Sequence, residues 1–141
     1  MTSGSLREAD AKRLVLDFFD LAFVKRDAAQ AAERYLGTEY KQHNPTAPDG
    51  REVFPDLIGG LFAQAPGASF HLKRAVAEDD LVVLHYHLKI SPDDLGQAVV
   101  DIFRVADGRI VEHWDVTQAV PADSANANGM LRRGSPAPSP D

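Results

Sequence analysis

The stretch of residues 101–116 constrains the fold most, because it predicts two antiparallel strands joined by a tight turn near Asp107-Gly108. Alternate side chains along a strand point to opposite faces of a sheet. Each predicted strand mixes ionisable residues with large apolar ones. The carboxylates and the histidine of this hairpin therefore lie either on a solvated face or in a pocket, and that choice decides whether the hairpin could carry catalysis.

Two turn types compete, and they give opposite faces to the same side chains. A two-residue loop at Asp107-Gly108 would place Asp101 opposite Trp114. A three-residue loop, with residues 106–108 in the turn and a bulge at the glycine, would place Asp101 opposite His113. A slip of one residue exchanges the two faces of the strand, so Asp115 shares a face with Asp101 only in the second register.

We favour the three-residue loop on two grounds. It allows Arg104 and Glu112 to pair on the outer face of the sheet. It also collects a mixture of polar and aromatic side chains that suits a pocket on the other face: Asp101, Phe103, His113 and Asp115. The two-residue loop would instead bring Glu112 and Trp114 to the side of Asp101.

The remainder of the chain predicts helices first and strands afterwards. Apolar periodicity and capping signals indicate helices over residues 5–25, 27–36 and 51–64, with a loop after Tyr40 that runs to residue 50. Alternating apolar residues predict strands over residues 69–77, 81–90, 97–105 and 110–118, which would form a four-strand meander. Three helices followed by an antiparallel sheet predict an α+β fold.

Composition narrows the possible partners. The chain has 141 residues, so one domain is expected, and its net charge of −6 with scattered basic residues argues against nucleic acid. It contains no cysteine, which excludes disulfides and thiolate zinc sites. No secretory signal and no apolar run of about 20 residues is visible, so we expect no membrane span and a cytoplasmic location.

Several phrases of the sequence resemble the SnoaL-like branch of the nuclear transport factor 2-like superfamily. They lie at residues 40–45 (YKQHNP), 100–104 (VDIFR), 107–118 (DGRIVEHWDVTQ) and 126–130 (NANGM). The resemblance predicts a SnoaL-like domain over residues 1–130, followed by a disordered tail over 131–141. It implies a cone with a pocket between a curved antiparallel sheet and three helices, and it implies neither a metal nor an organic cofactor.

The SnoaL-like branch includes polyketide cyclases that perform an intramolecular aldol condensation, and the resemblance places their catalytic carboxylate at Asp115. A carboxyl group in an apolar cleft can act as a base or an acid near neutral pH. A cyclase also needs a second group that stabilises the enolate, a role for Asp101 or His85. The predicted substrate-binding residues are Tyr40, His43, Asn44, Phe103 and His113.

The sequence also contains signals of two other kinds of site. His85 and His87 share one strand face and could chelate a metal with His113, but we predict no metal. The phrase at residues 100–104 is also similar to the ketosteroid isomerases. Asn44 and Phe19 stand where those enzymes would have their base and their tyrosine, so steroid isomerisation is not expected.

The sequence thus predicts a cofactor-independent lyase or isomerase that acts on a carbonyl-containing small molecule. Fold alone does not fix function, and a non-catalytic ligand-binding or dimerisation module is the alternative. A homodimer is expected through the outer face of the sheet. The apolar residues that would need covering there are Val100, Ile102, Trp114 and Val116.

Overall fold

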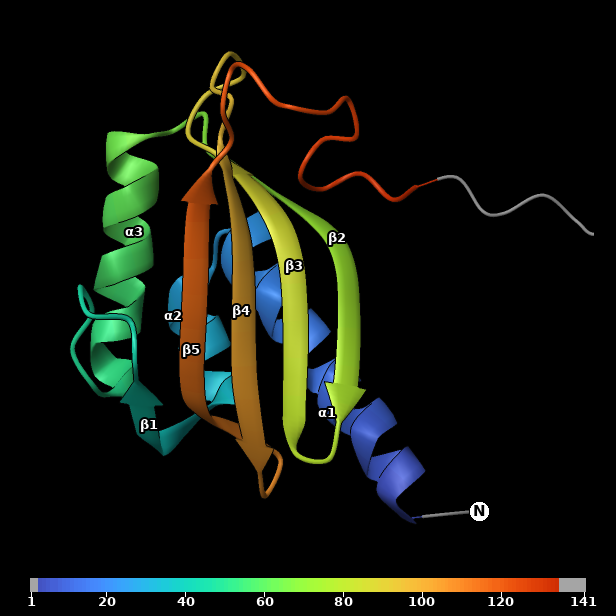
Figure 1. Cartoon of the computed structure of the whole chain (residues 1–141). Helices are drawn as coiled ribbons and strands as arrows, with labels where there is room; N and C mark the ends of the chain where they lie inside the picture. The colour runs from blue at the N-terminus through green and yellow to red at the C-terminus, as the bar shows by residue number, and fades with distance from the viewer. Residues whose placement is uncertain (1–2, 135–141) are drawn as a thin grey trace, which may run out of the picture.

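The computed structural model describes residues 3–134, and in it helices pack on one face of a curved, five-stranded sheet (Figure 1). The helical elements are α1 (Ser3–Phe19), the π-helical turn η1 (Asp20–Val24), α2 (Ala28–Tyr35), the 3-10 turn η2 (Arg51–Val53) and α3 (Phe54–Gln64). The strands are β1 (Leu36–Gln42), β2 (Ser69–Glu78), β3 (Leu81–Lys89), β4 (Gln97–Ala106) and β5 (Arg109–Ala119). The predicted α+β class is confirmed.

The sheet has the order β1-β5-β4-β3-β2, so β2 to β5 form the expected antiparallel meander. The prediction missed β1, which pairs parallel with β5 at one edge. Its sequence, LGTEYKQ, lacks the alternation of a strand, and pairing with β5 holds it in place. A Cβ at Gly37 would lie only 3.1 Å from Val111 Cγ1, so glycine permits the close approach of the two strands.

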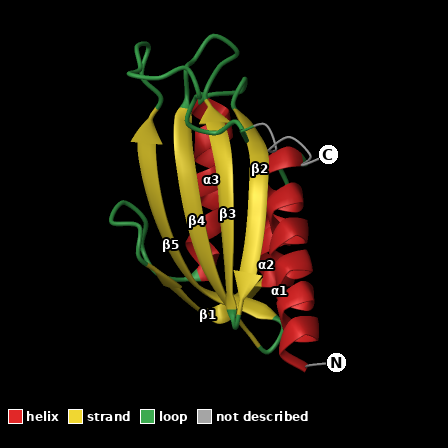
Figure 2. Ribbon diagram, turned by 45° about the vertical axis from the view of Figure 1, so that its right-hand side comes forward, coloured by secondary structure: helices red, strands yellow, loops and turns green. Residues whose placement is uncertain are grey.

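The core lies between the helices and the inner face of the sheet. Phe18 of α1 is 1% exposed and meets Phe103 of β4 at 5.8 Å between ring centroids. Phe19 meets Tyr86 of β3 at 5.2 Å. Figure 2 shows the helices behind the sheet, which leaves its other face as an outer surface. Burial of each large apolar side chain contributes about 1.5–3 kcal/mol, so this aromatic layer holds α1 to the sheet.

The turn between β4 and β5 is the two-residue type, and the predicted three-residue loop is wrong. Asp107 and Gly108 both have positive φ, 52° and 74°, as a type I′ hairpin requires. Aspartate and glycine tolerate this backbone conformation better than most residues. The local chemistry of the Asp-Gly pair therefore determined the turn.

The face assignment nevertheless follows the favoured prediction, because β5 contains a bulge. Val105 pairs with Ile110, whereas Arg104 pairs with Glu112, so Val111 is an extra residue without a partner. The bulge shifts the alternation by one residue. Residues 113 and 115 consequently share the inner face with Asp101 despite the short turn.

The chain after β5 crosses to the outer face of the sheet. Leu131 is 8% exposed, and its carbonyl accepts a hydrogen bond from Arg74 Nη2 at 2.7 Å. Residues 135–141 of the predicted disordered tail lie outside the described residues, and the domain boundary at residue 130 stays a prediction. Within the described part of the chain, no helix is long and apolar enough to cross a membrane.

Deletion of Val111 is expected to preserve the fold, because Arg104 would still face Glu112 in a regular ladder. We expect a loss of unfolding free energy within about 2 kcal/mol, measured by chemical denaturation. Deletion of Ile102 in the adjacent strand is the control. It would turn Asp101 outward with no bulge to absorb the change, and it should abolish cooperative unfolding. Equal damage from both deletions would contradict the role given to Val111.

Candidate active site

Three ionisable side chains meet on the inner face of β4 and β5. Asp101 lies directly opposite Asp115, and His113 lies diagonally between them. His113 Nε2 is 3.1 Å from Asp101 Oδ1 and 3.9 Å from Asp115 Oδ2. Like charges that face each other across strands repel, so each carboxyl needs a partner, and the imidazole is the partner of Asp101.

This trio is nearly enclosed. The side chains of Asp101, His113 and Asp115 are 5%, 10% and 16% exposed. Phe103 covers His113, with 4.9 Å between ring centroids, and Leu84 pairs with Asp101 on the other side. A buried charge is costly unless it is hydrogen-bonded, so the partners of these groups determine what they can do.

The segment that follows β1 supplies the partner of Asp115. Asn44 Nδ2 lies 3.1 Å from Oδ1 and 2.9 Å from Oδ2 of that carboxylate and donates to it. The opposite end of the amide, Asn44 Oδ1, accepts from the Thr46 backbone N–H at 2.8 Å and from Thr46 Oγ1 at 2.6 Å. The backbone N–H fixes which end of the amide faces Asp115.

Gln42 is the hydrogen-bond partner of His113, as Asn44 is of Asp115. Its Oε1 lies 2.6 Å from His113 Nδ1 and accepts from the Asn44 backbone N–H at 3.1 Å. Its Nε2 is 3.4 Å from the Tyr40 hydroxyl. Tyr40 itself is 5% exposed and faces the same interior. The strand missed by the sequence analysis therefore carries much of the polar network.

Two tyrosines surround the acid pair. Burial, and after it the negative charge of Asp101, raise the pKa of Tyr40 and of Tyr86 well above the usual value. Both phenols consequently stay protonated and are available only as neutral hydroxyls. Tyr86 was overlooked because it sits at an apolar position of the β3 alternation, and nothing in its own strand indicates its neighbour across the sheet.

The predicted site residue His43 lies on the outer face of the sheet, away from the buried trio. Its ring stacks on Trp114 at 4.9 Å and 9°, and its Nε2 lies 2.7 Å from Glu112 Oε2. Hydrogen bonds from Arg104 and then from His43 lower the pKa of Glu112. The backbone N–H of His43 donates to the His113 carbonyl at 3.0 Å. Neighbouring side chains in an extended chain face opposite ways. His43 therefore anchors this loop at the outer face of the sheet, while Asn44 points to the inner face.

His85 also belongs to the outer face, so its predicted place beside Asp101 is corrected. It pairs with Val100 in the ladder, and its Nδ1 accepts a hydrogen bond from the Arg74 guanidinium. Burial and the charge of Arg74 lower the pKa of His85. His85 and His87 point away from His113, so these three histidines do not form a metal site.

Within residues 3–134, one group of three metal-ligating side chains comes together. One ligand atom each from Asp101, His113 and Asp115 lies within 4.8 Å of the others. Two oxygens and one nitrogen could hold a divalent ion. In this structure the same atoms engage one another and Asn44, and the absence of a metal stays a prediction.

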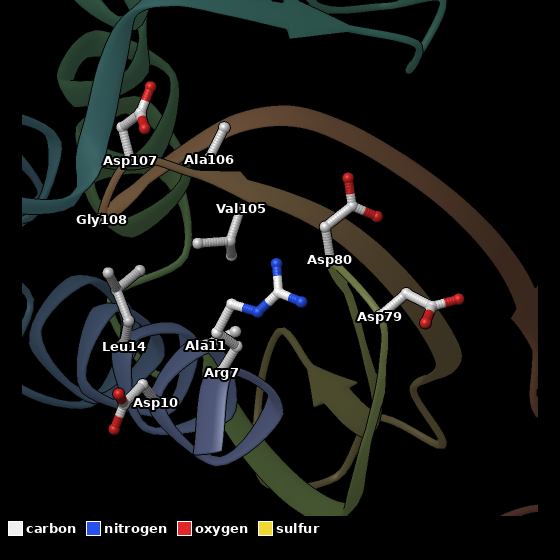
Figure 3. A pocket seen from close by; sticks show the side chains of 10 residues that line it. All are labelled: Arg7, Asp10, Ala11, Leu14, Asp79, Asp80, Val105, Ala106, Asp107 and Gly108. Carbon is white, nitrogen blue, oxygen red and sulfur yellow. The ribbon is translucent and has the colours of Figure 1, made fainter. Parts of the chain in front are cut away.

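Two cavities in the described part of the chain lie away from the buried trio. One of about 800 Å³ opens between α1 and the turns at the ends of two hairpins, as Figure 3 shows. Its lining includes Arg7, Asp10, Asp79, Asp80 and Asp107, and none of the buried trio. A second, of about 400 Å³, lies beside β1 and the turn at Asp107. The ligand pocket expected around Asp101 therefore stays a prediction.

The sequence profile of the SnoaL-like domain matches residues 15–113, which is more than half of the chain. The chain belongs to the SnoaL-like family. The resemblance drawn from the sequence phrases is thus confirmed for this SnoaL-like protein. No curated protein matches its sequence.

Solved structures share the fold of this SnoaL-like protein. A nuclear transport factor 2-like protein of unknown function from Mesorhizobium loti is 26% identical, with 80% of this chain and 94% of that one covered and a TM-score of 0.65. A candidate SnoaL-like polyketide cyclase from Jannaschia sp. CCS1 is 21% identical (78% and 86% covered, TM-score 0.66). A candidate ketosteroid isomerase from Kribbella flavida is 17% identical (92% and 93% covered, TM-score 0.67).

Alkaline titration tests the surroundings of the acid pair. An acid whose pKa is raised in the folded state keeps its proton while the unfolded chain loses it above about pH 10. The folded state then binds more protons, so its stability should fall as the pH rises past that value. Of the three tyrosines, at most one should ionise before unfolding, as measured by phenolate absorbance.

The Tyr40→Phe variant is the matched test. It should reduce the alkaline loss of stability, since one phenol no longer ionises on unfolding. Native protein that develops the absorbance of all three phenolates while its circular dichroism is unchanged would contradict the burial of Tyr40 and Tyr86.

Proposed function

We propose that this SnoaL-like protein is a cofactor-independent lyase or isomerase that removes a proton next to a carbonyl group of a small molecule. One observation carries the proposal. Asp115 is the most exposed member of the buried trio, and the Asn44 amide donates to both of its oxygens. That arrangement leaves the carboxylate as an acceptor, which is the form that a base needs.

The other two members of the trio supply the complementary role. Removal of a proton beside a carbonyl leaves negative charge on the carbonyl oxygen. A preorganised donor in a water-poor site stabilises such charge. Asp101 and His113 lie within 4.8 Å of Asp115 and share a hydrogen bond, so a substrate oxygen at this position would meet a proton donor.

An enolate formed in this way can attack a second carbonyl of the same molecule. The result is the intramolecular aldol condensation of the polyketide cyclases, and we propose this as the reaction type. The substrate would be a moderately sized compound with at least one acidic C–H next to a carbonyl. Tyr40 and Phe103 would contact it, since both face the inner side near the trio.

Deuterium exchange gives a test that needs no knowledge of the natural substrate. A panel of 1,3-dicarbonyl compounds is incubated with the protein in D₂O, and exchange of the acidic C–H is followed by NMR or mass spectrometry. Asp115→Asn should slow the enzyme-dependent exchange by at least about 100-fold, because an amide cannot accept the proton. Asp107→Asn, in the exposed hairpin turn, is the matched control and should leave the rate unchanged.

The same assay separates catalysis from ligand binding. Saturable binding of a panel compound without any enzyme-dependent exchange would favour the non-catalytic binding module. Exchange that survives Asp115→Asn would remove that residue from the chemistry. Neither result depends on the complete cyclisation reaction.

We also propose that the protein forms a homodimer through the outer face of the sheet. Val116 is 71% exposed there, close to the half-buried Trp114, Val100 and Ile102. Exposed apolar surface of this kind favours association with a second surface. The expected location in the cytoplasm remains a prediction from the sequence.

A lysine at Val116 is expected to convert the dimer to a monomer, because it would bury a charge at the centre of the apolar face. Sedimentation velocity measures the change in mass. Val24→Lys is the matched control, since Val24 is 56% exposed on the helical side. A wild-type protein that sediments as a monomer, or a Val116→Lys variant that remains dimeric, would contradict the proposed interface.

A further inference from the structure

Gln42 has no obvious chemical role by its residue type, yet it contacts the imidazole of the buried trio. Its Oε1 lies 3.1 Å from the Asn44 backbone nitrogen. A backbone N–H can only donate, so the end of the amide that faces it must be the oxygen. The direction of the Gln42 amide is therefore set by the main chain.

That direction determines the hydrogen on His113. The same Gln42 oxygen lies 2.6 Å from His113 Nδ1. An amide oxygen can only accept, so Nδ1 must carry a hydrogen. A neutral imidazole has a single N–H, which leaves the lone pair on Nε2. This lone pair points at Asp101 Oδ1, 3.1 Å away.

A lone pair and a carboxylate oxygen repel each other at this distance. One additional proton removes the repulsion, either as imidazolium beside carboxylate or as imidazole beside carboxylic acid. Both forms contain the same number of protons. The contacts therefore imply that the Asp101–His113 pair holds one proton more than a neutral imidazole and a carboxylate.

Each way of losing that proton creates a new conflict. The other tautomer would direct the Nδ1 lone pair at Gln42 Oε1. Rotation of the Gln42 amide would then bring its NH₂ against the Asn44 backbone N–H. The side chains of Asp101 and His113 are only 5% and 10% exposed, so water cannot readily relieve either conflict.

We propose that Gln42 is a positioning residue that keeps one proton on the Asp101–His113 pair. The inference rests on the proposed function, in which the pair gives this proton to the substrate oxygen while Asp115 takes one from carbon. No net proton is gained or lost in that step. Water then returns a proton to the pair and receives one from Asp115, so the site is restored.

The other titratable groups around the imidazole do not take over the role of Gln42. Asp115 lies on β5, the strand that also carries His113. Asp101 lies on β4, Tyr40 on β1 and Tyr86 on β3. The two phenols stay protonated, and Asp115 is engaged by Asn44. Gln42 is the group that contacts Nδ1, so it determines that this ring nitrogen carries a hydrogen.

Long-range ¹H–¹⁵N NMR of the five histidine rings tests the proposal directly. The wild-type His113 ring, assigned by its loss in His113→Asn, should keep Nδ1 protonated from neutral to mildly alkaline pH. Gln42→Glu preserves an acceptor at the same place and should give the same pattern. Gln42→Met removes the acceptor, and the ring should change to the Nε2–H tautomer as the pH rises.

Loss of the acceptor could also disturb the loop, so Thr46→Val serves as a second control. It weakens the support of Asn44 without touching His113 and should leave the tautomer as in the wild type. An unprotonated Nδ1 in the wild-type protein would overturn the proposal. A wild-type tautomer in Gln42→Met, or a change in Thr46→Val, would do the same.

The exchange assay then separates this inference from the proposed function. Gln42→Met should lower the exchange rate by about tenfold or more and alter its pH profile, while Gln42→Glu should restore the profile. If the NMR pattern holds and no panel compound exchanges, the proposed reaction fails and the positioning role stands. If exchange depends on Asp115 but the tautomer is insensitive to Gln42, the positioning role fails alone.

Discussion

The extra residue in β5 is the constraint on which the site depends. A type I′ turn at Asp107-Gly108 and regular pairing would put Glu112 and Trp114 inside, against the aromatic core. Val111 takes up one residue without a partner and so restores Asp115 to the inner face. The turn and the site make opposite demands on the register, and the bulge satisfies both. Gly37 of β1 leaves the space that Val111 needs.

Enclosing three ionisable groups creates a second requirement, because each must find a partner within the protein. The hairpin alone cannot meet it, since Asp101 and Asp115 face each other. The partners come from one short segment, in which Gln42 supports His113 and Asn44 supports Asp115. The segment is held in turn by the stack of His43 on Trp114 at the outer face. His43 thus anchors the segment at the outer face, and Gln42 and Asn44 orient His113 and Asp115 at the inner face.

The sequence predicted the parts of this structure that depend on local patterns. The helix layer and the meander follow from capping signals, apolar periodicity and alternation, and at the start of α2 the backbone N–H of Gln30 donates to Asp27 Oδ1. The grouping of Asp101, Phe103, His113 and Asp115 was also anticipated, although for the wrong turn. β1 was missed because its stability comes from pairing with β5. His85 was misplaced because alternation tells that two side chains share a face, but not which face is buried when apolar residues occupy both.

The residues that escaped prediction share one property: their roles depend on hydrogen-bond direction. Gln42, Thr46 and Tyr86 have ordinary side chains, and their significance comes from what faces them across the fold. Residue type shows that a carboxyl or an imidazole is present but not which atom carries the hydrogen. Here the backbone N–H groups of Asn44 and Thr46 fix the direction of the Gln42 and Asn44 amides. These amides in turn fix the direction of the hydrogen bonds at His113 and Asp115. Both backbone donors lie in the loop after β1, so the proposed protonation pattern of this site depends on how that loop is held against the sheet.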